Sequence, residues 1–284
     1  MNTSMTAVRA GMKRGAVEFR NSLQNPADIG YYIIGNAVFV AVLILNRDSM
    51  IDEVGMPVTR FIFPGVLAMI VVFIVAYGLA TLISTEREDG TLLRMKSIPH
   101  GMAGYVIGQS TRTSLELAFS AVILTTAASI LVPGLWEKGP AAVFGVLGLL
   151  VLGVLACLPL GFALGSIFKN PRSLGGWGFL VLGGLIYVSG VFMPILSLPW
   201  FVQIVGQVFP LYWLGLGMRS VLLPDAAVAI EIGESWRTLE TLGVLGIWAV
   251  VGLLLAPVLL RRMARRESGS AIEARREKAM QRVG

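Results

Sequence analysis

Six long apolar runs dominate the sequence and constrain its fold more than any other feature. Each is near or above the ~20 residues that an α-helix needs to cross a ~30 Å hydrocarbon core. Helices are expected because backbone groups in lipid must be hydrogen-bonded, and because the runs lack the alternation of a membrane barrel strand. The predicted spans are Ile29–Leu45, Phe61–Ser84, Tyr105–Val132, Ala141–Phe168, Leu174–Met193 and Thr241–Leu260.

The composition points to the same class. Hydrophobic residues make up 55% of the chain and charged residues only 14%, with a mean hydropathy of +0.76, which is outside the range of ordinary soluble domains. We therefore predict an all-α membrane protein with one six-helix transmembrane domain over residues 27–262. Residues 1–26 precede it and a basic tail, residues 263–284, follows it.

Lys and Arg residues are distributed unevenly between the two sides of this topology. Most of them fall in the N-terminal segment, the loop after the second span, the Lys169–Arg172 loop and the C-terminal tail. By the positive-inside rule, both termini and the first of these loops are predicted to be cytoplasmic. The formal net charge of +6 is then a topology signal, and no nucleic-acid partner is expected, although the tail alone could also bind RNA or anionic lipid.

The N-terminal segment, residues 1–26, is predicted to form an amphipathic helix that lies in the membrane interface. Asn25 and Pro26 end it and direct the chain into the bilayer. A poorly ordered basic tail is the alternative. Its apolar residues can gather toward one side with basic residues at the rim: Val8, Met12, Val17, Phe19 and Leu23, with Arg9, Lys13, Arg14 and Arg20.

A compact charged segment, "ISTEREDGTLLRMKSIP", separates the second and third spans. Thr85 and Glu88 have the spacing of a capping box, which predicts a short cytoplasmic helix over residues 85–98. Gly90 permits a bend, Thr91 can start the helix again, and Pro99 ends it. Its apolar residues exceed what a loop needs, so it is either a plug for the groove of a soluble partner or a solvated charged hairpin. These apolar residues are Leu92, Leu93, Met95 and Ile98.

Prolines and glycines divide a second unusual segment, residues 194–222, into short pieces. Pro194, Pro199 and Pro210 leave pieces of about ten to thirteen residues, which reach only ~15 to 20 Å as helices. We predict two re-entrant half-helices on the outer face, with Trp200, Tyr212 and Trp213 at the headgroup level. A seventh span here is the alternative, but it would send the C-terminal Arg cluster outside.

The sequence lacks the motifs of several kinds of chemistry. No Gly-Lys dipeptide occurs, so a P-loop for a nucleotide triphosphate is absent. One His and one Cys do not make a His/Cys metal site, and no Gly-x-Ser-x-Gly turn accompanies the single His. We therefore predict that this chain alone is not an enzyme and carries no catalytic, cofactor-binding or metal-binding residues.

Arg112 and Glu116 form the one predicted charge pair inside a span. They are four residues apart near the cytoplasmic third of the third span, so each can partly neutralise the other. They either line a passage or face a partner subunit, or Arg112 reaches the headgroups and Glu116 only pairs with it.

Two motifs resemble the permease subunits of ABC-type-2 exporters, a family that includes daunorubicin-resistance-like drug exporters and polysaccharide exporters. The charged segment is similar to the family pattern Glu-Arg-Glu-x-Gly-Thr-Leu-x-Arg-x-x-x-x-Pro. Met95 and Lys96 depart from the leucines that are usual there. The segment "MPILSLPWFVQIVGQVFPLYWLGLGMRSVL" is similar to the family's Pro-x-x-x-Leu-Pro and Pro-Leu-x-Tyr/Trp stretch, which closes with an Arg. The positions that match the first pattern are Glu86, Arg87, Glu88, Gly90, Thr91, Leu92, Arg94 and Pro99.

The resemblance implies roles that the residues alone do not. Residues 85–98 would be a coupling helix against a separate ABC ATPase that carries ATP and Mg, with two ATPase copies and a second permease chain, identical or related. The complex would export drug-like or lipid-like amphiphiles across a bacterial plasma membrane. A membrane scaffold or sensor that docks a cytoplasmic partner is the alternative. The implied ATPase-coupling residues are Glu86, Arg87, Glu88, Gly90, Thr91, Leu92, Leu93, Arg94 and Met95, and the implied exit-gate residues are Pro194, Pro199, Trp200, Pro210, Tyr212, Trp213 and Arg219.

Overall fold

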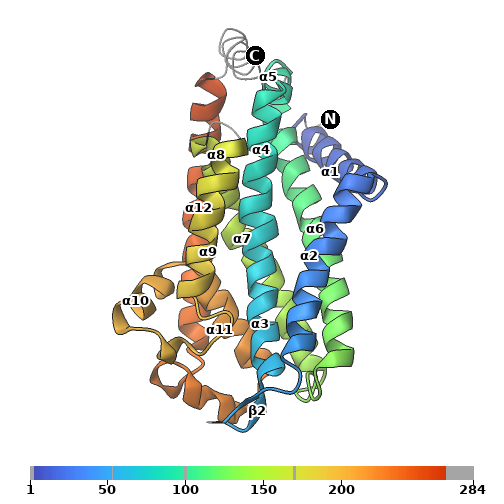
Figure 1. Ribbon diagram of the computed structural model, residues 1–284. Helices are drawn as coiled ribbons and strands as arrows, with labels where there is room; N and C mark the ends of the chain where they lie inside the picture. The colour runs from blue at the N-terminus through green and yellow to red at the C-terminus, as the bar shows by residue number, and fades with distance from the viewer. Residues whose placement is uncertain (1–2, 53, 99–100, 169–170, 267–284) are drawn as a thin grey trace, which may run out of the picture.

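The computed structural model describes residues 3–52, 54–98, 101–168 and 171–266, which are almost entirely helical (Figure 1). A two-stranded antiparallel hairpin, β1 (Met50–Ile51) with β2 (Met56–Pro57), is a short addition that the sequence did not predict. The helices are α1 (Thr3–Ser22), α2 (Pro26–Leu45), α3 (Val58–Val71), η1 (Val72–Gly78), α4 (Leu79–Glu88), α5 (Thr91–Lys96), α6 (Gly101–Leu131), α7 (Pro140–Ile167), α8 (Pro171–Ser173), η2 (Leu174–Gly178), α9 (Phe179–Val188), η3 (Ile195–Ser197), α10 (Trp200–Val208), α11 (Pro210–Leu222), η4 (Asp225–Ile230), η5 (Ile232–Glu234) and α12 (Thr238–Arg266).

Five helices in the described part of the chain are long and apolar enough to cross a membrane, or six if the bent pair α10 and α11 counts as one span. The five correspond to the predicted first, second, third, fourth and sixth spans. The first begins earlier than predicted because the Asn25 side chain accepts the Ala27 N–H and Pro26 occupies the first helical position. The predictions in this region therefore agree with the structure to within a few residues.

The predicted fifth span, Leu174–Met193, is not among these five helices. The chain is helical over α8, η2 and α9, but the helix ends at Val188 and the backbone turns at Gly190, whose φ of +62° is left-handed. Residues 189–193 therefore leave the helix. Figure 1 shows α9 ending beside α10, which it contacts.

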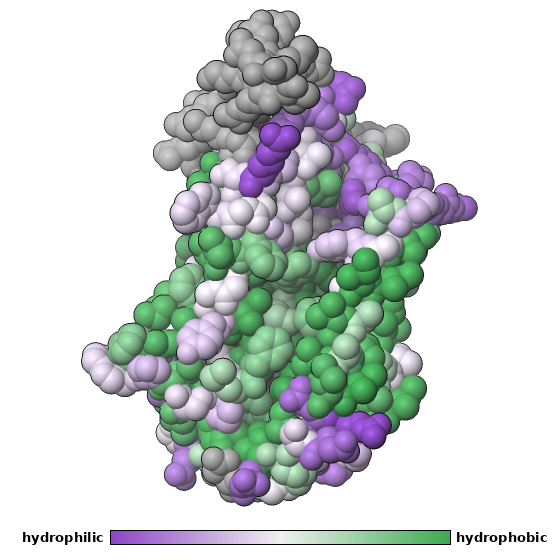
Figure 2. Space-filling model, viewed as in Figure 1, coloured by the Kyte–Doolittle hydropathy of each residue, from purple (hydrophilic) through white to green (hydrophobic). Residues whose placement is uncertain are grey.

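The α3–η1–α4 helix is the centre of the bundle. Its apolar segment is 67% buried, far more than that of any other candidate span. It packs against α6, α7 and α11, and α12 packs on α7 and α11. In Figure 2 the visible face carries a belt of apolar side chains around the middle and polar side chains at both ends, as expected for a protein with lipid around its waist.

α1 packs closely on α6 through glycines. A Cβ atom on Gly15 would lie 2.2 Å from the carbonyl oxygen of Gly108, and one on Gly11 would lie 2.7 Å from that of Gly104. Small residues four apart on both helices allow this approach of the two backbones. The predicted N-terminal helix is thus present, and glycines make its closest approach to α6 while Phe19 packs on Phe119; the predicted apolar residues Val8, Met12 and Val17 stay exposed.

Candidate functional site

Glu86, in the last turn of α4, is the centre of a buried polar cluster. Its carboxylate accepts hydrogen bonds from Tyr105 Oη at 2.6 Å and from Gln109 Nε2 at 3.0 and 3.1 Å, both on α6. Arg14 of α1 lies 3.6 Å away and also pairs with Glu18 at 2.6 Å. A buried carboxylate is tolerable only with such donors. The cluster ties α4 to α6 and α1.

Arg87 points to the other side of α4. Its guanidinium Nη1 donates to the carbonyl oxygens of Gly165 and Phe168, each at 3.1 Å, at the end of α7. The last carbonyls of a helix have no intrahelical partner and carry a partial negative charge, so a cation is favourable there. Glu86 and Arg87 are 9% and 7% exposed. They position α4 among three neighbouring helices and present little surface to a soluble partner.

The turn between α4 and α5 differs in detail from the prediction. Thr85 does not cap a new helix, because its hydroxyl donates to the Thr81 carbonyl oxygen at 3.1 Å and α4 continues to Glu88. The break falls at Gly90, with φ +81° as its predicted bend requires. Thr91 is the first residue of the next helix and not its cap; the cap position is Gly90, and Asp89 Oδ1 accepts the Thr91 N–H at 2.8 Å. The predicted helix 85–98 is therefore the end of α4 followed by α5.

α5 is a short helix anchored by one side and open on the other. Leu92 is 1% exposed and belongs to the hydrophobic core, whereas Leu93 and Met95 are half-buried. Arg14 Nη1 contacts Met95 Sδ at 2.9 Å. The predicted helix end, Pro99, lies outside the described residues. The exposed residues of the segment 85–98 are Thr85, Glu88, Asp89, Arg94, Ser97 and Ile98.

At the opposite end of the bundle, α10 and α11 meet at 93°. Two short helices with a sharp break between them were predicted, and Pro210 begins the second. The three aromatic residues predicted at the headgroup level differ in their surroundings. Trp200 is 72% exposed, but Tyr212 is fully buried and Trp213 is 4% exposed, with its indole N–H donated to the Gln207 carbonyl oxygen. The side chains of Tyr212 and Trp213 are buried because α11 packs against α3, α7 and α12, and their depth at the headgroup level stays a prediction.

Arg219 of α11 forms a fully buried ion pair with Glu231. Their side chains are 0% and 1% exposed, and Arg219 Nε lies 2.5 Å from Glu231 Oε1. The guanidinium also lies 5.1 Å from the centre of the Phe61 ring. Pro194 and Pro199 precede η3 and α10 in the same region. The ion pair therefore links α11 to α3 and to the segment that follows α11.

Arg112 and Glu116 form the predicted pair on α6. Arg112 Nε lies 2.9 Å from Glu116 Oε1, and the two side chains are 20% and 17% exposed. Both line a cleft between α2, the α3–η1–α4 helix and α6. Their role, as a lining of this cleft or as a mere charge pair, stays a prediction.

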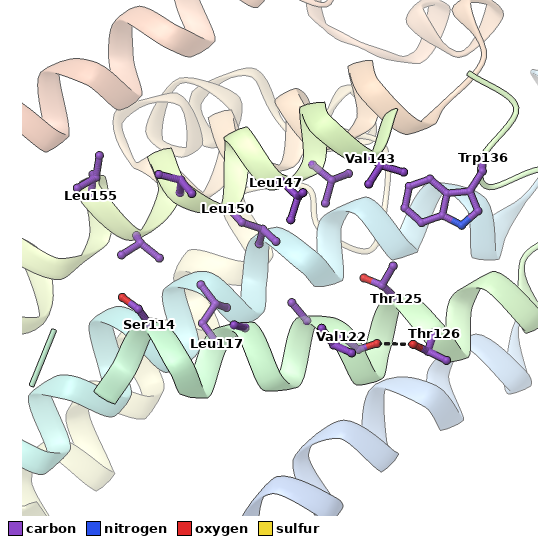
Figure 3. Close-up of a pocket in the computed structure, with 15 residues that line it drawn as sticks. Ser114, Leu117, Val122, Thr125, Thr126, Trp136, Val143, Leu147, Leu150 and Leu155 are labelled. Carbon is purple, nitrogen blue, oxygen red and sulfur yellow. Dashed lines mark hydrogen bonds between the residues drawn. The ribbon is translucent and has the colours of Figure 1, made fainter. Parts of the chain in front are cut away.

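A larger cavity of about 760 Å³ lies between α6 and α7 (Figure 3). Valine, leucine and alanine side chains make up most of its wall, and Trp136 closes one end. Of the hydroxyls near it, that of Thr126 is bonded to the Val122 carbonyl oxygen at 2.7 Å. The cavity offers hydrocarbon contact and little that would orient a polar group. In residues 3–52, 54–98, 101–168 and 171–266, no group of three or more His, Cys, Asp or Glu residues could hold a metal ion.

Several residues of these sites were not predicted from the sequence. The pairs Gly11 with Gly15 and Gly104 with Gly108 carry a recognisable signal, the Gly-x-x-x-Gly spacing. The partners of Glu86 and Arg219 carry none. The side chains that hydrogen-bond to Glu86 and Arg219 lie 12 to 23 residues away, Arg14 and Phe61 lie much farther along the chain, and all these contacts depend on how the helices pack.

The long apolar helices and their polar ends define a multi-pass helical membrane protein. The family model described as ABC-2 family transporter protein matches residues 2–257. Because this is nearly the whole chain, the protein belongs to that family. Its members are transporter permeases without a nucleotide-binding domain of their own, which implies an ABC ATPase as partner. A comparison with curated proteins finds no match.

Proposed function

We propose that this permease subunit works in an exporter that moves drug-like or lipid-like amphiphiles outward across a bacterial plasma membrane. Two copies of a separate ATPase, each with ATP and Mg, would drive a pair of permease chains, identical or related. The resemblance to the daunorubicin-resistance-like branch supports the substrate class and the direction. In the proposed orientation the α5 end and both termini are cytoplasmic, which agrees with the uneven distribution of Lys and Arg.

The connection of α5 to the bundle is the observation that carries this proposal. Leu92 anchors α5 in the core, and the preceding turn holds Glu86 and Arg87, which bond to α6 and α7. A push on the exposed side of α5 would therefore reach several helices. Glu88 and Arg94, both exposed, would contact the ATPase there, and their charges would orient it.

The α10–α11 segment is proposed as the exit gate. It is short, broken at Pro210, and closed by the Arg219–Glu231 pair. Opening would require α11 to move against α3. The half-helices would enter from the outer face, and Trp200 alone of the three predicted aromatic residues would lie at the headgroup level.

The decisive experiment reconstitutes the permease with its ATPase in proteoliposomes and measures ATP-dependent export beside ATP hydrolysis. Gly90→Pro should abolish export while hydrolysis continues, because proline cannot adopt the left-handed φ at this position. Arg94→Glu should weaken the association of the ATPase. Asp48→Asn, an exposed charge at the other end of the bundle, is the matched control and should change neither.

Three results would count against the proposal. Transport by the purified chain without any ATPase, or unchanged coupling in Gly90→Pro, would remove the coupling assignment. If a protein other than an ATPase binds α5, and no transport is seen with or without an ATPase, the scaffold or sensor function is favoured instead.

A further inference from the structure

A cleft of about 320 Å³ lies between α2, the α3–η1–α4 helix and α6. α2 packs on α6, and Figure 1 shows it diverging from α4 toward the α5 end. The cleft is thus in the α5 half of the bundle. Its lining combines apolar, aromatic and charged side chains, unlike the wall of the larger cavity between α6 and α7.

The central helix presents an ordered row of side chains to this cleft. In an otherwise buried helix, residues 73, 74, 77, 78, 81, 82 and 85 keep some exposure. In a regular α-helix such a row would drift around the axis, because about 3.6 and not four residues make a turn. The wider turn of η1, a π-helix, offsets that drift. Tyr77 and Thr81 of this row line the cleft.

Aromatic rings form one edge of the cleft. The Tyr31 ring of α2 stacks on Phe73, with ring centres 6.4 Å apart and planes at 15°, and Phe73 lies 5.6 Å from Tyr77. Tyr31 is 54% exposed, so its ring is available to a ligand. The faces of such rings carry partial negative charge and attract cations.

The charged side chains of the cleft also favour a cation. Two carboxylates, Asp28 and Glu116, and one guanidinium, Arg112, line it, so its net formal charge is negative. Arg112 is already bonded to Glu116. No hydrogen bond or ion pair engages the Asp28 carboxylate in the part of the chain that the structure describes, and Asp28 is half-buried in the first turn of α2.

A ligand for this cleft therefore needs a cationic headgroup. An anionic headgroup would meet two carboxylates and a guanidinium that is already paired. The cleft volume suits a headgroup with a short part of its chain, and the rest of the chain would extend between α2 and α4 into hydrocarbon. We propose that this cleft recruits amphiphiles with an ammonium headgroup, held by the Asp28 carboxylate and the faces of Tyr31 and Tyr77. The inference rests on the proposed exporter function and names its substrate class.

The test uses the full-length chain in nanodiscs of zwitterionic phosphatidylcholine, without ATP. Two fluorescent probes of equal chain length, an alkyl trimethylammonium and an alkyl sulfonate, are titrated by fluorescence anisotropy. The cation should bind in preference to the anion. Asp28→Asn should weaken cation binding roughly tenfold, since the negative charge that pairs with the ammonium group is lost while the Tyr31 and Tyr77 rings remain. Asp28→Glu should restore it, and Asp48→Asn, the matched surface control, should leave it unchanged.

Tyr77→Leu is the second variant, since it removes the ring and keeps the apolar volume. Cation binding that persists in both folded variants, or equal binding of the sulfonate, would overturn the inference. Because the assay needs neither ATPase nor ATP, its result is separate from the exporter proposal. If the cation does not bind but the complex still exports an uncharged amphiphile with ATP, only the inference is refuted. If the cation binds but the complex exports nothing with ATP, only the exporter function is refuted.

Discussion

The α5 end and the α10–α11 end use buried charge in different ways. At the α5 end, Glu86 has neutral donors from α6 and a more distant Arg14 that is bonded to Glu18, and the exposed side of α5 stays open. At the other end, Arg219 and Glu231 are sealed together inside the protein. A charge with several neutral donors can exchange partners as helices shift, whereas a sealed pair tolerates separation poorly. The comparison predicts that helices shift against one another at lower cost at the α5 end than at the α10–α11 end.

The largest expected effect is on the sealed pair. Arg219→Ala should lower the free energy of unfolding by about 3–5 kcal/mol, because it leaves Glu231 as an uncompensated buried charge. Thermal unfolding of the detergent-solubilised protein measures this loss. The double variant Arg219→Met with Glu231→Leu should recover most of it. If the double variant unfolds as easily as Arg219→Ala, the Arg219–Glu231 pair is not what stabilises the α10–α11 end.

Glu86 should give a smaller stability loss and a larger loss of coupling. Glu86→Ala leaves Tyr105 Oη and Gln109 Nε2 without their acceptor, at a cost of about 1–3 kcal/mol. Glu86→Gln keeps an acceptor and should cost less. The measurement is the number of molecules exported per ATP hydrolysed, beside thermal stability. Equal stability losses at Glu86 and Arg219 would remove the contrast between the two ends.

The close glycine contact between α1 and α6 tests how tightly helices pack at the α5 end where no charged group is involved. Gly15→Ala should cost about 1–2 kcal/mol, because its Cβ would lie 2.2 Å from the Gly108 carbonyl oxygen and α1 would have to move. Gly30→Ala is the control, since no atom lies within 4 Å of that added Cβ. Crosslinking of α1 to α6 through introduced cysteines measures the displacement. Identical crosslinking in the two variants would show that the close packing is not needed.

The smallest effect concerns a pair at the α10–α11 end in which Glu137 is exposed and Arg60 is buried. The Arg60 guanidinium, by hydrogen bonding and by its charge, lowers the pKa of Glu137 below its ordinary value of 4.5. A lowered pKa stabilises the folded state above pH 4.5, and this contribution is lost as the pH falls through the folded pKa. The melting temperatures of wild type and Glu137→Gln should therefore differ slightly at pH 7 and converge in acid. A gap that widens in acid would contradict this sign.

Much of the architecture could be predicted from local sequence. The spans of α2, α6, α7 and the α3–η1–α4 helix follow from apolar runs of sufficient length, since the bilayer sets that length directly. The break at Gly90 and the break at Pro210 follow from the backbone chemistry of those residues. The Arg112–Glu116 pair follows from helical spacing. Each of these depends on residues close together in the chain.

Other features depended on residues that only the packed bundle brings together. The amphipathic pattern of residues 1–26 predicted a helix, but its glycine face on α6 depends on the partner helix. Tyr212 and Trp213 were predicted at the headgroup level, but their side chains are buried because α11 packs inside the bundle. α9 is shorter than predicted because the chain turns at its end, and hydropathy does not reveal that turn. The sequence by itself determined most of the helical segments and the breaks at Gly90 and Pro210, because hydrophobicity and backbone preference act locally. Only the tertiary structure decided which charges are buried and with whom, because the cost of a buried charge depends on partners from distant helices.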